Sequence, residues 1–463
     1  MGVRVRIAPS PTGYLHVGTA RAALFNFLFA RQNNGAYILR LEDTDVERSK
    51  AEYEEKIYES LDWLGLVPDE GPIQGGPFAP YRDSERKDDH RASLHALLAE
   101  GNAFFCSHPS DDKDYSVHWC EFRDGGGDSG GIIRFKTPQH RDISFNDLIR
   151  GRVTINTDTF GDFSIARNLD SPLYNFAVTV DDEAMRITHV IRGEDHIANT
   201  PKQILLQEAL GYISPQFGHL PLLLGTDRSK LSKRHGVTSV VEFREQGYLP
   251  EALVNFIALL GWNPGDDREI FSLNELISLF SLEKVQKSGA IFDVAKLDWM
   301  NSEYIRMLSV SELADRLIPF MEKADLNPRG IGREKLEQVV ALEQPRLKTL
   351  SEIGERTFYF FKEPMYDKEL LRWKGMSDNE VSESLKFSEK IMESRIKNQE
   401  SRNEIEKIFL RTIGEGDKGK MLWPLRVALT GLRASPGPFD IIAILGVEET
   451  LKRVRAAIRF LAK

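Results

Sequence analysis

A strand that runs into a proline-rich turn and then into a helix opens this sequence, and this feature restricts the fold most. Residues 3–7 alternate aliphatic and arginine side chains, the period of a strand with two different faces. Two prolines and a glycine in the segment PSPTG end that strand in a turn. The apolar spacing from Thr19 to Gln32 predicts a helix that ends near Gly35.

The following segments extend the same alternation. Residues 36–41 predict a second strand, and residues 51–64 a second helix after the acidic segment EDTD. Strand–helix order resumes over residues 188–210 and continues to a loop near 225–236. This order predicts a Rossmann-like α/β domain built on a parallel, doubly wound sheet.

Between these two halves, the runs IIRFK, VTINT, FSIAR, YNFAVTV and RITHVIRG predict strands, separated by glycine-rich and acidic loops. We interpret this part as an inserted α+β module. After Val240 the apolar period is almost entirely helical to the end, which predicts all-α domains.

Composition sets limits on the class of protein. No run approaches the ~20 apolar residues of a membrane span, and the first residues lack the apolar block of a signal peptide. Two cysteines exclude a disulfide framework. We therefore expect a soluble cytoplasmic protein. The net charge of −9 argues only weakly against nucleic acid, because phosphate contacts depend on local patches such as the basic final segment LKRVRAAIRFLAK. Taken alone, that segment is more typical of a solvated terminal helix.

The turn after the first strand is the first candidate site. It contains Pro9, Ser10, His16, Gly18 and Thr19. A strand end and a helix start meet there, at the edge of a parallel sheet where ligands bind. Gly18 permits close approach of a ring, and donors beside a helix amino terminus favour phosphate. The alternative interpretation is a purely structural histidine.

The second candidate is the basic segment KLSKR, with Lys230 and Lys233 three residues apart on a predicted loop. Cations placed there neutralise a triphosphate as charge shifts toward pyrophosphate. The alternative is an ordinary solvated basic loop.

Together the two segments resemble the signature pair of class I aminoacyl-tRNA synthetases. HVGT corresponds to their HIGH motif and departs from it at the last position, and KLSKR corresponds to KMSKS with the same kind of departure. The stretches RIAPSPTGYLHVGTARAALFN, LRLEDTD, VIRGEDHIANTPKQ, LPLLLG and LVNFIALLGW resemble the glutamyl branch. The resemblance implies a bacterial-type glutamyl-tRNA synthetase, which forms glutamyl-adenylate with ATP and Mg²⁺ and then esterifies tRNA(Glu), and which requires bound tRNA for activation.

The same resemblance implies residue roles. ATP contacts are expected from Pro9, Ser10, His16, Gly18, Thr19 and Lys233, with His16, Gly18, Lys230 and Lys233 as the catalytic set. Glutamate contacts are expected from Arg6, Ser10, Glu42, Tyr174 and Arg192. The residues agree, because arginines at the ends of buried strands are costly unless they meet an anion. Guanidinium groups also read carboxylates in a bidentate manner.

The helical part is expected to read the tRNA. By resemblance, Arg346 reads the third anticodon base, and Arg426, Ser435 and Pro436 make other anticodon contacts; arginines in helical patterns are also common without such roles. The implied domains are the two halves of the Rossmann-like domain (1–82 and 175–239), the inserted acceptor-end domain (83–174), the stem-contact domain (240–310) and two anticodon-binding subdomains (311–366 and 367–463). A monomer is expected.

Three other functions compete with this interpretation. A glutaminyl-tRNA synthetase shares the motifs but normally continues into β-barrel domains. A truncated relative that glutamylates a modified base lacks the helical part. A binding-only paralogue need not keep His16, Gly18, Lys230 and Lys233. Whether tRNA(Gln) is also charged stays open.

The inserted module holds both cysteines, in the pairs Cys106-x-His108 and His118-x-Cys120. Two cysteines and two histidines suit tetrahedral Zn²⁺. Relatives carry a zinc site here built around C-x-C, and this sequence has Phe104 where we place the first of those cysteines. The alternative is a buried thiol pair with surface histidines, so the sequence assigns no metal.

Overall fold

The computed structural model describes residues 2–44, 48–108, 117–396 and 400–462. The chain divides into two compact units, one of Met1–Arg244 with Pro250–Leu297 and the other of Glu245–Leu249 with Asp298–Lys463. Helix α9 (Val294–Met307) carries the chain from one to the other. This division falls inside the predicted stem-contact segment 240–310, and the finer domain boundaries stay predictions.

The first unit is built on a six-stranded sheet in the order β2-β1-β9-β10-β5-β6. The first five strands pair in parallel, and β6 is antiparallel to β5. The predicted parallel α/β sheet is therefore confirmed. Its strands are β1 (Arg4–Ile7), β2 (Ala36–Leu39), β5 (Asp142–Asp147), β6 (Gly151–Asn156), β9 (His189–Gly193) and β10 (Gln216–Leu220).

Strand β1 is buried on both faces, although its sequence alternates aliphatic residues with arginine. Val5 and Ile7 belong to the core, and Arg6 is also buried. The arginines are accommodated by carboxylates, because Arg4 pairs with Glu70 at 2.7 Å and Arg6 pairs with Asp182 at 3.1 Å. Ion pairing offsets the cost of burying a cation inside a sheet.

Helix α1 (Val17–Gln32) follows β1 as predicted. Most of its residues are buried, because it packs against β1 and β9 and also against α7 (Pro250–Leu259) and α8 (Leu273–Leu279). Phe25 of α1 meets Phe280 edge to face, with ring centroids 5.2 Å apart. Burial on several sides explains why apolar residues occur around most of the circumference of the helix, with Arg21 and Asn26 as buried polar exceptions.

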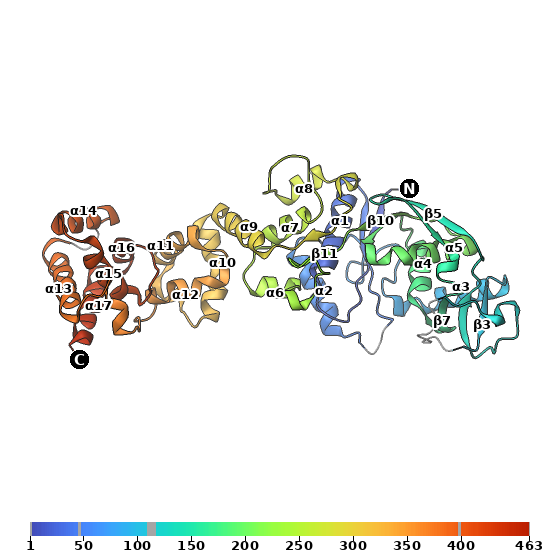
Figure 1. Ribbon diagram of the computed structural model, residues 1–463, viewed down its shortest axis with the longest axis horizontal. Coiled ribbons are helices and arrows are strands. Elements are labelled where there is room, and N and C mark those ends of the chain that lie inside the picture. Colours follow the sequence, from blue (N-terminus) through green and yellow to red (C-terminus); the bar gives the residue numbers. More distant parts are fainter. Residues whose placement is uncertain (1, 45–47, 109–116, 397–399, 463) are drawn as a thin grey trace. The chain divides into compact units, whose positions relative to one another are not determined.

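The inserted segment contributes to two sheets (Figure 1). A four-stranded antiparallel sheet forms the body of the module, and the β5–β6 hairpin leaves it to pair with β10 of the main sheet. The strands of the smaller sheet are β3 (Ala103–Cys106), β4 (Ile132–Phe135), β7 (Ser164–Asn168) and β8 (Ser171–Pro172). The remaining elements of this unit are α2 (Ala51–Trp63), α3 (Lys87–Ala99), α4 (Tyr174–Ala184), α5 (Thr200–Leu210), α6 (Val240–Glu245), β11 (Leu223–Leu224) and β12 (Ala290–Ile291).

The expectation that the run YNFAVTV forms a strand is wrong, because these residues begin helix α4. Residues 176–182 of this helix are all buried. A short helix that is buried all round has the same apolar run as a buried strand, so periodicity does not separate the two. The other four runs lie in β4, β6, β7 and β9 as predicted.

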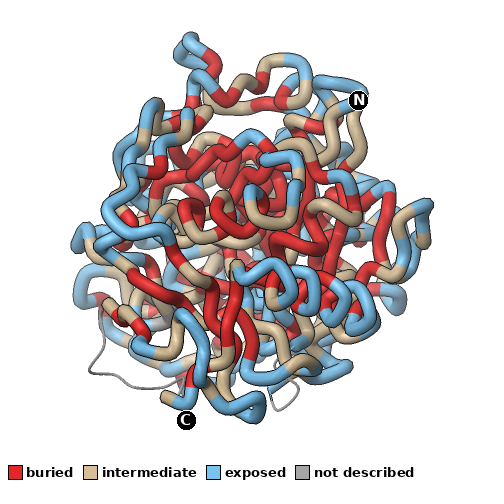
Figure 2. The backbone as a smooth tube through the Cα atoms, turned by 90° about the vertical axis from the view of Figure 1, so that its right-hand side faces the viewer, coloured by how far each residue is buried: buried red, intermediate tan, exposed pale blue. Residues whose placement is uncertain are grey.

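The second unit is helical, as the sequence predicts. Ser377 and Ser401 cap two of its helices through reciprocal capping boxes with Glu380 and Glu404. Figure 2 colours the whole described chain by burial, and buried stretches alternate with exposed ones along the tube. Over the described ranges, no helix is long and apolar enough to cross a membrane. The helices are α10 (Val310–Lys323), α11 (Arg333–Glu343), α12 (Ile353–Thr357), α13 (Asp378–Arg395), α14 (Arg402–Ile413), α15 (Lys418–Thr430), α16 (Pro438–Leu445) and α17 (Val447–Leu461).

The basic residues of α17 are largely paired with acids of the same unit. Arg455 pairs with Glu389 at 2.7 Å, and Arg453 pairs with Glu449 at 2.8 Å. These contacts favour the interpretation of this segment as a helix stabilised by its own charges over that of a basic patch.

Candidate active site

A cavity of about 690 Å³ lies at the carboxyl ends of β1 and β9, the edge where the sequence predicts the ligand site. It brings together residues from positions 6 to 231. Every residue predicted to hold ATP or glutamate lines it except Lys233, whose side chain lies outside the described part. The predicted residues on its wall are Arg6, Pro9, Ser10, His16, Gly18, Thr19, Glu42, Tyr174, Arg192 and Lys230.

His16 is the residue that caps helix α1. Its Nδ1 accepts a hydrogen bond from the backbone N–H of Gly18 at 3.0 Å. A neutral imidazole that accepts at Nδ1 carries its proton on Nε2, so the ring is a donor on that edge. A Cβ built on Gly18 would lie 3.3 Å from His16 Nδ1, so this cap favours glycine. The helix amino terminus thus faces the cavity with donors suited to phosphate.

The basic segment KLSKR lies beside this helix start. The backbone N–H of Val17 donates to the carbonyl of Thr238 at 2.9 Å, and His16 bridges to Ser239. Lys230 lines the cavity, and its Nζ lies 3.1 Å from a carboxylate oxygen of Asp195. Lys233 begins the short 3-10 helix η5 (Lys233–His235), three residues after Lys230. The two sequence motifs therefore meet at one cavity.

Arg6 belongs to a network of buried arginine and carboxylate side chains next to the cavity. Asp182 of α4 accepts from Arg6 and also from Arg40, whose Nη1 lies 2.6 Å from Oδ1. Arg40 further approaches Glu42 at 3.4 Å and Asp83 at 3.6 Å. Burial raises the pKa of Glu42, although the charges of Arg40 and Arg6 oppose the rise. A further cation beside Glu42, such as a substrate ammonium, would stabilise the charged form of this carboxylate.

Arg192 differs from Arg6 because it has no carboxylate partner among the described residues. Its side chain is buried, with Nη2 donating to Thr200 at 2.8 Å and to Gln203 at 2.9 Å. Nη1 has no hydrogen-bond partner within the described ranges. Burial lowers the pKa of this guanidinium, although the neighbouring Tyr174 hydroxyl and the charge of Asp182 oppose the fall. A buried cation on a cavity wall with no carboxylate at ion-pair distance is a candidate site for an anion.

Arg21 and His196 are among the groups on the cavity wall that sequence reasoning missed. Arg21 of α1 is buried and donates to the carbonyls of Pro221 and Leu260, and burial lowers its pKa to about 10. His196 accepts or donates at 3.1 Å to the hydroxyl of Tyr174. Burial, with the charge of Arg192, lowers the pKa of His196 to about 4, so this ring is neutral at pH 7.

Comparison with known proteins identifies the family. Residues 2–114 and 121–299 match the class I tRNA synthetases (E and Q), catalytic domain, and residues 312–458 match an anticodon binding domain. A glutamate–tRNA ligase of Carboxydothermus hydrogenoformans is 44% identical over 98% of this chain and 99% of its own length. The chain belongs to the glutamate–tRNA ligase family. A further member, from Aquifex aeolicus, is 46% identical over 98% of each chain.

Solved structures of the family agree with this assignment. The crystal structure of a glutamate tRNA ligase from Elizabethkingia meningosepticum, in complex with its amino acid, matches with a TM-score of 0.88 at 33% identity over the whole of both chains. A glutamate–tRNA ligase is an aminoacyl-tRNA ligase, and the cavity described above lies within the segments that match the family's catalytic domain.

The predicted anticodon residues lie in the second unit. Arg346 and Ser435 line a cavity of about 380 Å³. Glu343 is fully buried and accepts from Nη1 of Arg346 at 3.1 and 3.2 Å. Arg426 lies 4.7 Å from the ring centroid of Trp423 and donates to a backbone carbonyl, and Ser435 donates to the carbonyl of Pro436. Two of the four residues thus share one cavity wall.

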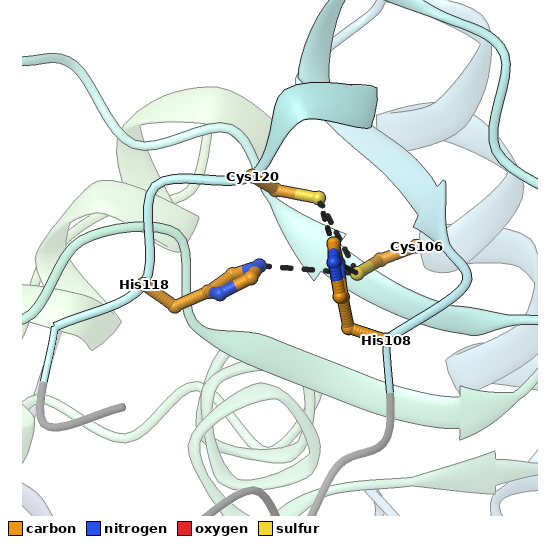
Figure 3. A group of neighbouring side chains, drawn as sticks. All are labelled: Cys106, His108, His118 and Cys120. Carbon is orange, nitrogen blue, oxygen red and sulfur yellow. Dashed lines mark hydrogen bonds between the residues drawn. The ribbon is translucent and has the colours of Figure 1, made fainter. Parts of the chain in front are cut away.

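The cysteine and histidine pairs of the inserted module converge (Figure 3). The sulfurs of Cys106 and Cys120 lie 3.3 Å apart, and Nδ1 of His108 is 3.4 Å and 3.7 Å from them. Nε2 of His118 lies 3.9 Å from the Cys106 sulfur. An ion bound tetrahedrally at ~2.3 Å to sulfur and ~2.1 Å to nitrogen spaces its ligand atoms by roughly 3.4–3.8 Å.

The surroundings of this cluster suit a structural metal. Both cysteines are buried and free, at the end of β3 and just before the turn at Glu121–Asp124. Phe104, which stands near the position expected for a further cysteine, packs with them in a small apolar cluster. The two histidines complete a set of four ligand atoms within 4.8 Å of one another. The residues present therefore fit Zn²⁺.

Proposed function

We propose that this ligase activates L-glutamate with ATP and transfers the glutamyl group to the 3′ end of tRNA(Glu). The single observation that carries this proposal is the buried Arg192, which has no carboxylate at ion-pair distance in the described part of the chain and lies on the wall of the cavity that also holds the His16 turn. Its cation requires an anionic partner from the substrate. Glutamate supplies a side-chain carboxylate, and family membership supplies the reaction.

Glutamate binding is assigned to five residues. Nη1 of Arg192 binds the side-chain carboxylate, and Glu42 binds the ammonium. The ammonium stabilises the charged form of Glu42, which burial disfavours. Arg6 remains paired with Asp182, which holds its guanidinium group in position to contact the glutamate. Ser10 and Tyr174 supply hydroxyl groups on the same wall. Glutamine would leave the charge of Arg192 uncompensated, which favours glutamate.

ATP binding is assigned to the helix start and the basic loop. Pro9, Ser10, Gly18 and Thr19 surround the adenosine and phosphates, and His16 donates from Nε2. Lys230 and Lys233 neutralise the charge that develops on the leaving pyrophosphate. Mg²⁺ bound with ATP would add positive charge beside the triphosphate, next to that supplied by Lys230 and Lys233. Catalysis rests on positioning and charge neutralisation, and no covalent protein intermediate is required.

Isotope exchange between pyrophosphate and ATP tests the activity. We expect exchange that depends on both glutamate and tRNA(Glu), with glutamine at equal concentration giving less than about a hundredth of the rate. Exchange that proceeds equally with glutamine contradicts the assignment and favours a glutaminyl enzyme. Absence of exchange with every component present favours a binding-only paralogue.

We also propose that Arg346, Arg426, Ser435 and Pro436 contact the anticodon, and that Arg346 restricts charging to tRNA(Glu). The cavity at Arg346 supports this role, because the guanidinium is half-exposed while Glu343 fixes its position. Charging assays with both tRNAs test it, and equal charging of tRNA(Gln) identifies a non-discriminating enzyme. A monomer in solution is part of the proposal and is checked by light scattering.

A second proposal concerns the inserted module, in which Cys106, His108, His118 and Cys120 bind one structural Zn²⁺. Four converging ligand atoms from two short segments favour it over a metal-free thiol pair. Metal analysis of the purified protein tests it. We expect about one equivalent of zinc, and less than about a tenth of an equivalent rejects the site.

A further inference from the structure

A buried histidine contacts Arg192 without lining the cavity. His219 of β10 is the register partner of Arg192 on the neighbouring strand β9. It is fully buried, and the Nε of Arg192 donates to its Nε2 at 3.3 Å. A guanidinium has only donors, so Nε2 must be an acceptor and the imidazole proton must lie on Nδ1. The contact therefore fixes one tautomer of His219.

The Nδ1 proton has a buried acceptor of its own. Oδ2 of Asp147, on β5, lies 2.6 Å from Nδ1 of His219. The other carboxylate oxygen accepts from the backbone N–H groups of Ile149 at 2.9 Å and Arg150 at 2.8 Å. Because the backbone holds Asp147, the line Asp147–His219–Arg192 is fixed at one end by the main chain of the sheet.

This line determines which edge of the guanidinium remains for a ligand. His219 holds Nε, while Thr200 and Gln203 hold Nη2, so Nη1 is the nitrogen left without a partner in the described part of the chain. We propose that Asp147 and His219 are positioning residues, which present Nη1 of Arg192 to the side-chain carboxylate of glutamate. This inference rests on the glutamate role proposed for Arg192.

Two substitutions at His219 separate positioning from simple stability. Asn places an amide where Nδ1 was, so His219→Asn keeps the donor to Asp147 but loses the acceptor for Arg192. Gln reaches the position of Nε2, so His219→Gln keeps an acceptor for Arg192 and loses the bond to Asp147. If His219 has a purely structural role, the Asn variant should be closer to wild type. If it positions Arg192, the Gln variant should be closer to wild type.

We expect His219→Asn to raise the KM for glutamate about tenfold or more and to leave the KM for ATP within about twofold. In His219→Gln the glutamate KM stays nearer to wild type. Asp147→Asn is a second arm, because an amide donor at this position forces the proton onto Nε2, against the N–H of Arg192. We expect it to raise the glutamate KM although Asp147 does not touch Arg192, because the wrong tautomer of His219 then turns an N–H toward the guanidinium.

His90 provides a matched control. It is as buried as His219 and lies 2.9 Å from the buried Asp181, but it does not line the cavity or contact Arg192. His90→Asn loses its bond to Asp181, as His219→Gln loses its bond to Asp147, so it should lower the melting temperature and leave the glutamate KM unchanged. If glutamate and ATP KM values rise together, or if Gln and Asn at position 219 are equally defective, the positioning role is overturned. Should a variant at 219 not fold, Asp147→Asn decides by the same two constants.

The same assays keep this inference separate from the proposed function. Wild-type exchange that does not depend on glutamate refutes the function itself. Wild-type exchange that depends on glutamate, together with unchanged constants in folded His219→Asn and Asp147→Asn, refutes only the positioning pair.

Discussion

Replacing Arg192 by Gln should separate function from stability. Nη1 of Arg192 carries two N–H groups without a partner in the described chain, whereas Nε and Nη2 already bind His219, Thr200 and Gln203. The contact that the substrate loses in this variant is therefore the one with Nη1. A charge-assisted hydrogen bond of this kind contributes about 3 kcal/mol to binding. That free energy corresponds to a fall in kcat/KM for glutamate of ~150-fold. The KM for ATP should stay within about twofold, because the phosphates are assigned to other residues.

The matched control is Arg86→Gln. Arg86 is equally buried but has its own carboxylate, Asp181, at 2.8 Å, and it does not line the cavity. Breaking this pair should cost about 3–5 kcal/mol of unfolding free energy and leave glutamate kinetics unchanged. Steady-state exchange kinetics and urea unfolding measure both variants. A kcat/KM for glutamate within about fivefold of wild type in Arg192→Gln would refute the assignment of this arginine.

Three further predictions concern the charge network, the metal cluster and the anticodon cavity. Burial alone would raise the pKa of Asp182, but Arg6 and Arg40 lower it, so its stabilisation is complete above about pH 4 and is lost as pH falls further. Asp182→Asn should therefore lower the free energy of unfolding by roughly 3 kcal/mol at pH 7, and its stability should fall less steeply as the pH is lowered. An unchanged midpoint of urea unfolding contradicts the network. Cys120→Ser or a strong chelator should remove zinc and lower the melting temperature by several degrees, about 2–4 °C per kcal/mol lost, and a metal-free protein with unaltered melting rejects the site. Arg346→Gln should raise charging of tRNA(Gln) relative to tRNA(Glu) about tenfold, and an unchanged ratio excludes Arg346 as the discriminating residue.

Local signals predicted the framework of the fold and the cavity wall. Taken alone, the turn before α1 and the basic loop each also fit a structural histidine or a solvated loop. Their resemblance to the class I signature pair predicted that His16, Gly18 and Lys230 lie at one site, and all three line the cavity. Partners that are distant in sequence were not found. Asp182 lies 176 residues from Arg6, and no local pattern connects them.

The errors have physical causes as well. The run of α4 contains the β-branched residues Val178, Thr179 and Val180, which favour strands unless tertiary packing overrides them. Arg21 looks like an ordinary polar residue of an amphipathic helix, and only the fold shows that it points into a buried wall. The metal cluster stayed undecided because spacing alone does not show whether two histidines face two cysteines.

The hairpin β5–β6 has a consequence for protein engineering. A designer who excised the inserted segment as a cassette would also delete two strands of the main sheet. Strand β10 would then become an edge, with the N–H and C=O groups that now meet Asp147 and Leu148 left exposed. Such an edge invites pairing with a second chain, so a trimmed protein should precipitate unless the graft retains residues 142–156.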